Sequence, residues 1–388
     1  MPGEGELVGT VVTFEGELPK GYGRKKGNIT ELTLEEAAYL FEKGKITVRE
    51  GDRILSLEEF FKVALERSPG FELRYLVYKD LKERGYYVKP SALNFRLYQR
   101  GSKPGEKPPK YSVLVVSERT PITMTELVKH LEIARNMRKS LIIAIVDEES
   151  EVTFYEAKRL ELGSHNVGSE GVYTERYSSA GDESSMPKSV VEVEKSTNVP
   201  ASTLPARASL LEDRVVVWDE DTARKLYESE WFGKLSGGRL QLSLVEAAYL
   251  LRRGEITVED ASGKHLSFEE FVRTANSIEK DFGSKYAVYE DLRERGFIVK
   301  TGFKFGSHFR VYERREQPHS RYLVHVVPRE HVFTMPELSR AVRLAQSVRK
   351  QMVFAYEDTN DAAGAGGGEK AGAGSRRIKY VGVGRVKL

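Results

Sequence analysis

The sequence of 388 residues contains no cysteine, and that absence excludes several kinds of site. Without thiols there are no disulfides, thiolate zinc sites, iron–sulfur clusters or cysteine nucleophile. No apolar run approaches the roughly 20 residues that span a bilayer. The first residues include two glutamates and no basic stretch before an apolar one, so we expect no secretory signal. These absences predict a soluble, cytoplasmic protein with no membrane partner.

The chain also has little net charge of either sign. Its 61 basic and 58 acidic residues give +3, a balance that identifies no class of partner. A nucleic-acid-binding protein can have this balance if its basic residues are clustered, so their distribution matters more than their sum. Hydrophobic residues make up 40%, with 19 Tyr and 17 Phe, which is enough to form cores. The length predicts about two to four domains.

An internal duplication is the strongest pattern in the sequence. Three blocks recur in the same order with a spacing near 211 residues: 32–48 with 242–258, 75–89 with 286–300, and 122–145 with 333–356. That spacing is far too long for a solenoid repeat. The chain therefore contains two copies of one module, here called copy one and copy two.

Each copy has the same predicted elements. In copy two, a helix that ends at Gly254 and one over 267–275 precede a third that ends at Gly296. The stretches IVK, FKF and HFRVYE in 298–313 then alternate like strands, as does RYLVHVV. Thr334-x-x-Glu337 predicts a capping box for a helix that runs to about Lys350, and QMVFAYE reads as a buried strand. Thr123-x-x-Glu126 repeats the box in copy one.

These elements predict an α+β fold built by tandem duplication. Each repeat has a small N-terminal half of helices and strands, and a C-terminal half with helices on a mixed sheet. The predicted segments are 1–70 and 71–162 for repeat one, a linker at 163–208, and 209–280 and 281–388 for repeat two. Low-complexity 359–375 predicts a further loop. Residues 376–388 hold five basic residues and no acid, and they predict one or two final strands.

The seven histidines are unevenly placed, since four lie within 25 residues: His308, His319, His325 and His331. Metal binding is weakly supported because no HExxH or HxxxH motif is present, and we predict no metal and no cofactor. Ordinary surface or strand histidines are the simpler interpretation.

Comparison of the copies separates these histidines. Tyr312 aligns with Tyr98 once three extra residues near 301–309 are allowed, and Lys350 aligns with Lys139. His319, however, aligns with Pro108. One active and one degenerate copy would give this pattern, and so would simple drift.

Three spaced blocks carry a resemblance to a known family. Tyr312-Glu-Arg, then His319-Ser-Arg-Tyr-Leu-Val, then Ser347-Val-Arg-Lys350 resemble the active-site blocks of the archaeal tRNA-splicing endonucleases, and 297–312 is similar to the strand block before them. The resemblance covers most of 30–157 and 214–358. The duplicated layout resembles the subclass in which a double-length chain forms a homodimer with one catalytic and one structural repeat per chain.

The resemblance implies metal-independent cleavage of precursor tRNA at bulge–helix–bulge sites, with 2′,3′-cyclic phosphate and 5′-hydroxyl products. It implies Tyr312 as general base, His319 as general acid and Lys350 as the group that stabilises the phosphorane charge. These residue types suit the chemistry, because histidine exchanges a proton near neutral pH and lysine is a cation. A free phenol has a pKa of about 10, so Tyr312 would need a neighbouring cation such as Lys350.

Each assignment has an alternative when it is judged from the residues alone. Tyr312 is then more simply a strand aromatic, and Lys350 a lysine at the C-terminus of a helix. His308 is the rival general acid. The resemblance favours His319, because that residue directly precedes the RYLV strand.

Two arginines are candidate RNA-binding residues. The resemblance implies that a bulged base is held between two cationic planes, one on the helix before Lys350 and one near the C-terminus. Arg343 lies seven residues before Lys350, which is two helical turns, so we expect the two to face the same side of that helix. Arg385 fits the second position. Stacking of guanidinium on a splayed base contributes about 1–3 kcal/mol per base. A solvated helix face is the alternative for Arg343.

An acidic segment follows the strand 141–146: Asp147, Glu148, Glu149 and Glu151. The resemblance implies that an acidic loop at this place inserts into a basic cleft of a partner unit, which would make these residues part of the homodimer. An ordinary charged β-turn is the alternative.

Two other functions are alternatives to this interpretation. A non-catalytic RNA-binding or assembly subunit of the same fold would not need Tyr312, His319 and Lys350. A metal-dependent DNA nuclease would need a cluster of acids such as PD…(D/E)xK, and no convincing one is present.

Overall fold

The computed structural model describes residues 3–19, 21–163, 205–314, 317–358 and 377–388. The chain divides into two compact units, one formed by Met1–Leu162 with Val299–Leu388 and the other by Gly163–Ile298. Most of the predicted linker 163–208 and all of the predicted loop 359–375 lie outside the described residues.

The N-terminal halves of the two copies contain matching sheets. The first has strand order β3-β4-β2-β1-β5-β6 and the second β15-β16-β14-β13-β17-β18, so corresponding strands occupy corresponding places. The strands of the first are β1 Gly3–Val8, β2 Val11–Glu15, β3 Arg24–Lys26, β4 Ile29–Thr33, β5 Ile46–Glu50 and β6 Arg53–Ile54. Those of the second are β13 Ala206–Leu211, β14 Arg214–Val217, β15 Lys234–Ser236, β16 Arg239–Leu242, β17 Ile256–Glu259 and β18 His265–Leu266. The shared order confirms the duplication.

Each copy contains three corresponding helices in the same order along the chain. They are α1 Leu34–Glu42, α2 Leu57–Arg67 and α3 Phe71–Glu83 in copy one, and α6 Leu244–Arg252, α7 Phe268–Ile278 and α8 Phe282–Glu294 in copy two. Serine or threonine caps the first two helices of each set and forms a full capping box with a glutamate at N3. Copy two adds α5, Glu220–Glu230, which has no counterpart among the described residues of copy one.

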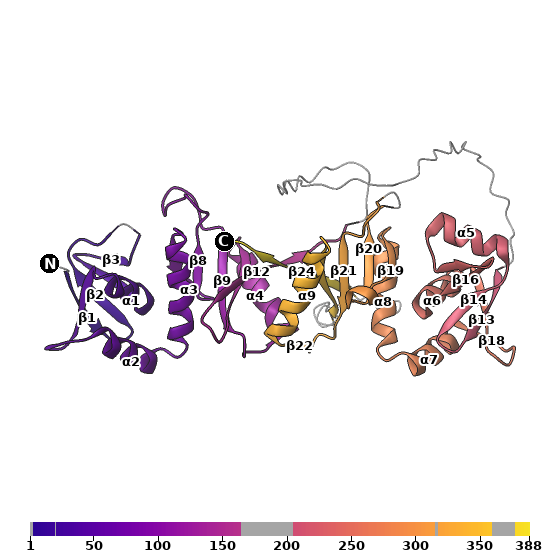
Figure 1. The fold of residues 1–388 in the computed structure, drawn as a ribbon, viewed down its shortest axis with the longest axis horizontal. Helices are drawn as coiled ribbons and strands as arrows, with labels where there is room; N and C mark the ends of the chain where they lie inside the picture. The colour runs from indigo at the N-terminus through magenta and orange to yellow at the C-terminus, as the bar shows by residue number, and fades with distance from the viewer. Residues whose placement is uncertain (1–2, 20, 164–204, 315–316, 359–376) are drawn as a thin grey trace, which may run out of the picture. The chain divides into compact units, whose positions relative to one another are not determined.

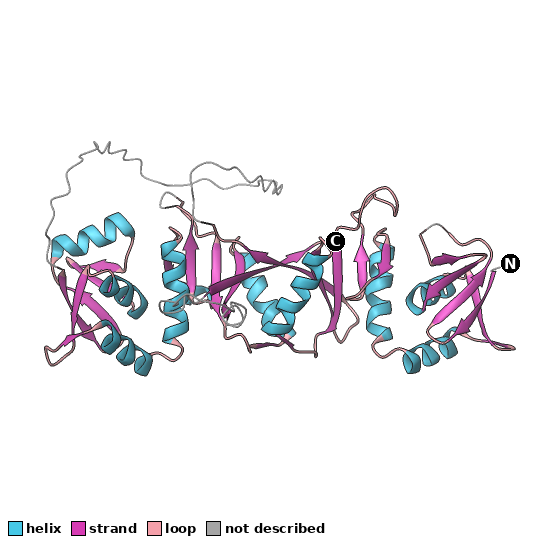
Figure 2. Cartoon of the chain, turned by 180° about the vertical axis from the view of Figure 1, so that it is seen from behind, coloured by secondary structure: helices cyan, strands magenta, loops and turns pink. Residues whose placement is uncertain are grey.

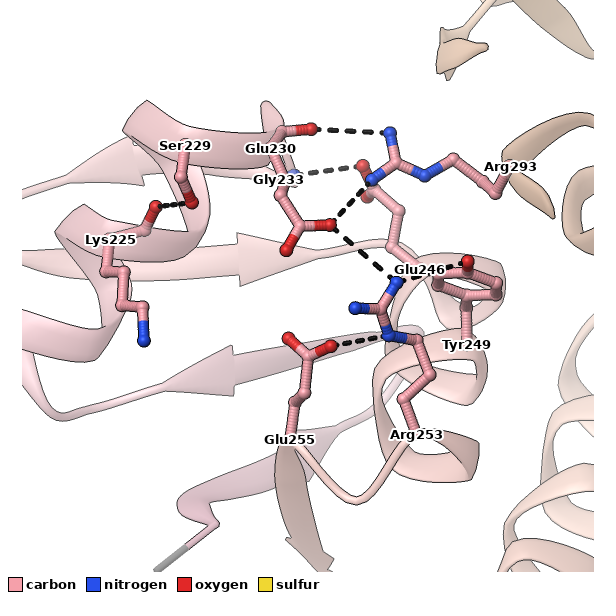
Figure 3. A network of polar contacts seen from close by, with 9 residues as sticks. All are labelled: Lys225, Ser229, Glu230, Gly233, Glu246, Tyr249, Arg253, Glu255 and Arg293. Atoms are coloured by element: carbon pink, nitrogen blue, oxygen red, sulfur yellow. Dashed lines mark hydrogen bonds and ion pairs between the residues drawn. The ribbon is translucent and has the colours of Figure 1, made fainter. Parts of the chain in front are cut away.

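A polar network fastens α5 within its unit (Figure 3). The Arg293 guanidinium donates at 3.3 Å to the Glu230 backbone oxygen and to its carboxylate, and it lies 4.2 Å from the centre of the Phe232 ring. Glu246 accepts from the Gly233 N–H at 2.9 Å while it also caps α6. The last turn of α5 is thus bonded to α8, and the segment that follows α5 is bonded to α6.

The C-terminal halves of both copies share one ten-stranded sheet in the first unit (Figure 1). Its order is β19-β20-β21-β23-β24-β12-β11-β9-β8-β7, which is the same series read outward from the centre for each copy. The copy-one strands are β7 Val88–Pro90, β8 Phe95–Leu97, β9 Tyr111–Ser117, β11 Ser140–Val146 and β12 Val152–Leu160. The copy-two strands are β19 Ile298–Thr301, β20 Phe309–Tyr312, β21 Tyr322–Val326, β23 Gln351–Asp358 and β24 Arg377–Val386. The predicted α+β fold is confirmed.

The two copies join where β12 and β24 pair antiparallel, from Phe154 opposite Val386 to Leu160 opposite Tyr380. The basic C-terminal segment is therefore a central strand of this sheet. Two short strands, β10 Ile122–Thr123 and β22 Val332–Phe333, also pair between the copies. Helices α4 Met124–Asn136 and α9 Met335–Ser347 lie side by side over the sheet (Figure 2). Alternate residues of β11, β12, β23 and β24 form one core with these two helices.

Two predictions for copy two were wrong in detail. The FKF stretch is a 3₁₀ turn over Phe303–Phe305, because Gly302 and the left-handed Gly306 bracket it and break the extended chain. Helix α9 ends at Ser347, short of the predicted end near Lys350. Arg349 there has a φ of 55°, and the Lys350 N–H returns to the Ala345 oxygen at 2.8 Å in a Schellman-type turn.

Candidate active site

The topology brings the three candidate catalytic residues to one edge of the sheet. Tyr312 is the last residue of β20, which runs antiparallel to β21 with Val311 opposite Tyr322. His319 lies just before β21. Lys350 lies just before β23, which is parallel to β21 with Tyr322 opposite Gln351. The end of β20 and the beginnings of β21 and β23 therefore lie together.

A hydrogen bond connects the Lys350 and His319 segments directly. Lys350 Nζ donates to the backbone oxygen of Ser320 at 3.1 Å, and the Gln351 N–H donates to the Arg321 oxygen at 3.0 Å. The half-buried Lys350 thus lies against the segment that carries the exposed His319. Burial lowers the pKa of Lys350, and repulsion from Arg310 lowers it further.

The corresponding lysine of copy one makes a different bond. Lys139 follows α4 through the same left-handed turn, with Arg138 at a φ of 55°. Its Nζ donates to the Met137 backbone oxygen at 2.8 Å, at the end of its own helix. The interpretation of a lysine at a helix C-terminus therefore describes Lys139, whereas Lys350 reaches across to the loop of His319.

The loop of His319 is fixed at both ends. Glu313 pairs with Arg321 and accepts a hydrogen bond from the Tyr322 hydroxyl at 3.4 Å, and the Arg321 N–H donates to the Val311 oxygen at 2.9 Å. Ser320 is only 3% exposed, and its hydroxyl has no hydrogen-bond partner among the described residues. Tyr312 is 8% exposed. An anchored loop with an exposed histidine is suited to proton transfer to a bound substrate.

The other three histidines of the cluster have structural contacts. His308 accepts a hydrogen bond at Nδ1 from the Val326 N–H at 2.9 Å, and its ring stacks on His325 at 4.4 Å between centroids. His331 Nε2 lies 3.4 Å from a Glu337 carboxylate oxygen beside the start of α9, and its ring is 4.5 Å from that of Phe333 between centroids. Within the described ranges, no group of three or more His, Asp or Glu side chains is placed to hold a metal ion.

The two candidate RNA-binding arginines come from neighbouring elements. Arg343 and Gln346 are three residues apart on α9, and the Gln346 side chain donates to the Arg385 backbone oxygen at 3.0 Å. Both arginines are exposed. The argument that Arg343 shares a helical face with Lys350 does not hold, because Lys350 lies beyond the helix. The bond to Arg385 is what relates the two arginines.

The acidic residues form the hairpin turn between β11 and β12. Asp147 accepts from the N–H groups of Glu149 and Glu151 at 3.0 and 2.9 Å, so its carboxylate organises the turn. Glu148 pairs with Arg119 at 2.5 Å, which raises the pKa of that guanidinium. Glu149 and Glu151 are exposed.

A cavity of about 710 Å³, lined mainly by copy one and also by Tyr356 and Val381 of copy two, includes the place that corresponds to this site. Pro108 and Lys139, the counterparts of His319 and Lys350, both line it. The cavity wall is strongly basic, with Lys107, Lys110, Arg135, Arg138, Lys139, Lys158 and Arg159 against Glu132 and Glu161. Copy one therefore gathers positive charge at this place but has Pro108 where copy two has the exposed His319.

Comparison with known proteins identifies the family. The profile described as "tRNA intron endonuclease, catalytic C-terminal domain" matches residues 71–154 and 282–363, and "tRNA intron endonuclease, N-terminal domain" matches 3–61 and 206–272. The chain belongs to the tRNA intron endonuclease family. As a member of this family it is a tRNA intron endonuclease. Each of the two family domains occurs twice in the chain.

Relatives of nearly equal length carry one name. The "tRNA-splicing endonuclease" of Methanosarcina mazei is 43% identical over 100% of this chain and 98% of its own length. The protein of the same name from Methanosarcina acetivorans is 44% identical over 100% of this chain and 99% of its own length. The one from Natronomonas pharaonis is 34% identical over 88% of this chain and 89% of its own length. These sources support the predicted archaeal origin. No helix in the described part of the chain is long and apolar enough to cross a membrane.

Two features of this region are not predicted by the sequence patterns above. Nothing in those patterns distinguishes Ser320, although it lies between His319 and the RYLV strand. The alternation of FKF predicts a strand at Phe303, whereas the flanking Gly302 and Gly306 are the signal for the turn that forms there.

Proposed function

We propose that this chain cleaves precursor tRNA at bulge–helix–bulge splice sites by metal-independent transesterification in copy two. The substrate 2′-oxygen attacks the adjacent phosphorus and the bond to the 5′-oxygen breaks, which yields a 2′,3′-cyclic phosphate and a 5′-hydroxyl. Because the nucleophile belongs to the RNA, no covalent enzyme intermediate is needed. The single observation that carries the proposal is the bond from Lys350 Nζ to the Ser320 oxygen beside His319.

Three side chains have separate roles in this reaction. Tyr312 accepts the proton of the 2′-hydroxyl, and His319 donates a proton to the departing 5′-oxygen. Lys350 stabilises the negative charge that develops on the phosphorane oxygens. The partial burial of Lys350 strengthens its interaction with that charge, because fewer water molecules screen it. The exposure of His319 lets it exchange protons with solvent between turnovers.

Recognition of the unpaired bases falls to Arg343 and Arg385. A guanidinium plane stacks on a splayed base and also pairs with phosphate. The bond from Gln346 to the Arg385 backbone places the two arginines on adjoining elements, α9 and β24. Bases within a duplex present no free face, so this pair would select bulged nucleotides.

Assembly as a homodimer is the second part of the proposal. The acidic turn of one chain would insert Glu149 and Glu151 into a basic surface of the other, while Asp147 holds the turn and Glu148 stays paired with Arg119. Complementary charge of this kind fixes the register of an interface and speeds association.

Product analysis tests the proposed reaction. A labelled bulge–helix–bulge RNA is incubated with the purified chain in excess EDTA, and the product ends are identified. We expect a cyclic phosphate and a 5′-hydroxyl at both intron boundaries. Cleavage that needs added Mg²⁺, or a 5′-phosphate end, would contradict the mechanism, and binding without cleavage would indicate a non-catalytic subunit.

A further inference from the structure

The turn over Phe303–Phe305 is specific to copy two. Residues 301–309 replace the shorter segment 90–95 of copy one, with three residues inserted. In copy one, Leu93 of this segment packs against the core that α4 and α9 share. Phe305 packs against the same core in copy two, so it takes the place of Leu93. The insertion therefore supplies an additional aromatic residue, Phe303, which copy one does not have.

Phe303 points its ring into solvent. It is 86% exposed, the highest value among the exposed large hydrophobic residues in the described part of the chain. An exposed phenyl ring gives up the roughly 1.5–3 kcal/mol that burial of a large apolar side chain contributes. Single exposed apolar side chains are common on protein surfaces, so the exposure of Phe303 gains meaning only from the turn that carries the ring and from what lies beside that turn.

The backbone beneath Phe303 is firmly held. Gly302 donates to the His308 oxygen at 2.9 Å, Phe305 donates to the Gly302 oxygen at 2.8 Å, and Gly306 donates to the Phe303 oxygen at 3.0 Å. A Cβ at Gly302 would lie 2.3 Å from the Ser307 hydroxyl, so only glycine permits this close approach. The ring is therefore mounted on an ordered turn, which reduces the entropy lost when a ligand stacks on it.

The same turn contacts the candidate active site. The Phe305 ring centre lies 5.8 Å from Lys350 Nζ and 5.8 Å from the Arg310 guanidinium. A Cβ at Gly306 would lie 3.6 Å from Leu344, the neighbour of Arg343 on α9. Lys304 is exposed between the two phenylalanines. Phe303 is thus an exposed aromatic ring on the same turn as Phe305, whose own ring lies near Lys350 and Arg310.

We propose that Phe303 is a stacking platform for one unpaired nucleobase next to the scissile phosphate, with Lys304 pairing with the RNA backbone. Every base presents a π-face, and exposed aromatic rings among cations bind single-stranded nucleotides in this way. The inference rests on the proposed function and adds a base-binding position outside Arg343 and Arg385. It also gives the inserted segment a reason to exist only in the catalytic copy.

The test couples a protein variant to an RNA variant. Wild type, Phe303→Ala and Phe303→Trp are compared on an intact bulge–helix–bulge RNA and on RNAs that each lack one bulge base. We expect Phe303→Ala to lower kcat/KM about fivefold to a hundredfold on intact RNA, while Phe303→Trp keeps it. On the RNA that lacks the stacked base, Phe303→Ala and wild type should have equal kcat/KM.

A control variant and a folding check accompany the test. Ile54→Ala removes another exposed apolar side chain, 65% exposed on β6, and should leave kcat/KM unchanged. Thermal unfolding checks that each variant is folded. Equal rates for Phe303→Ala and wild type on intact RNA would overturn the inference and leave the proposed function intact. The inference would also be overturned if Phe303→Ala lowered kcat/KM by the same factor on every RNA that lacks one bulge base.

Two further outcomes remain distinct. If Phe303→Ala lowers the fraction of dimer in sedimentation and base removal has no effect on its deficit, Phe303 belongs to an interface between copies and the inference is wrong. If wild type itself fails to cleave in EDTA, the proposed function fails. The base-stacking inference then fails with it unless RNA binding still shows the same coupling between Phe303 and one bulge base.

Discussion

Lys350 Nζ donates a hydrogen bond to the Ser320 backbone oxygen at 3.1 Å, whereas its counterpart Lys139 bonds the end of its own helix. The two lysines follow helices that end in the same left-handed turn. Their different hydrogen-bond partners distinguish copy two from copy one more clearly than the lysines themselves, which both copies keep.

Removal of the two lysines should therefore have unequal effects. We expect Lys350→Ala to lower the single-turnover cleavage rate about 10²–10³-fold, the usual effect of losing one group that stabilises transition-state charge. Lys139→Ala is the matched control, and it should leave the chemical rate unchanged. Equal losses in the two variants would show that Lys350 acts only through the fold.

The alkaline side of the pH–rate profile reports on Lys350. Burial and Arg310 lower its pKa, so the cation is lost at a lower pH than in a free lysine, and cleavage should fall accordingly as the pH rises. Arg310→Gln removes the repulsion and should move this fall to higher pH. Lys350→Arg stays charged up to about pH 12 and should abolish this titration. If the cleavage rate falls at the same pH in wild type and in both variants, the fall belongs to the titration of another group.

Ser320→Ala should stabilise the fold or leave its stability unchanged. The buried hydroxyl has no partner among the described residues, and an unsatisfied polar group costs about 1–3 kcal/mol. The Lys350 bond uses the backbone of Ser320 and is retained. Urea unfolding measures the change. A clear destabilisation would mean that the hydroxyl has a partner in solution, such as a bound water.

The junction of the two copies is sensitive at Gly382 on β24. A Cβ there would lie 2.5 Å from the Gln351 side-chain nitrogen and 2.8 Å from Leu160, so Gly382→Ala should cost about 1–3 kcal/mol by overpacking. Gly384, on the same strand, has no atom within 4 Å of such a Cβ, and Gly384→Ala is the control. Similar unfolding free energies for the two variants would contradict the packing at the β12–β24 junction.

Charge reversal of the acidic turn tests the homodimer. Glu149→Lys with Glu151→Lys should shift the protein from dimer to monomer in sedimentation equilibrium, more strongly at low salt. Glu212→Lys reverses an exposed acid at another hairpin turn, between β13 and β14, and should leave the dimer intact. If the double variant stays dimeric, the acidic turn is an ordinary exposed turn.

Local signals in the sequence predicted most individual elements. Thr123 and Glu126 form the expected capping box, with hydrogen bonds of 3.1 and 2.8 Å, and the glycine stops mark the helix ends. Alternation predicts a strand at FKF, but short turns share that alternation of apolar and polar residues. The helical pattern before Lys350 predicts too long a helix because Arg349 adopts a left-handed conformation that ordinary residues seldom use.

Long-range pairing was beyond what the sequence could indicate. Phe154 and Val386 are register partners across the β12–β24 junction, yet the local sequence of neither strand indicates that it pairs with the other. The candidate catalytic residues could be chosen only by the difference between copies and by family resemblance. Their meeting at one edge depends on the parallel pairing of β21 with β23, which is a property of the folded sheet.

The most direct test of the central claim uses the leaving group. A bulge–helix–bulge RNA with sulfur in place of the scissile 5′-oxygen releases a thiolate, which needs no general acid because a thiol pKa is only about 8.5. Wild type and His319→Ala are compared on both substrates in EDTA. If His319 is the acid, the variant loses about 10²–10⁴-fold on the oxygen substrate and regains nearly the wild-type rate on the sulfur substrate. An equal loss on both substrates would contradict that role.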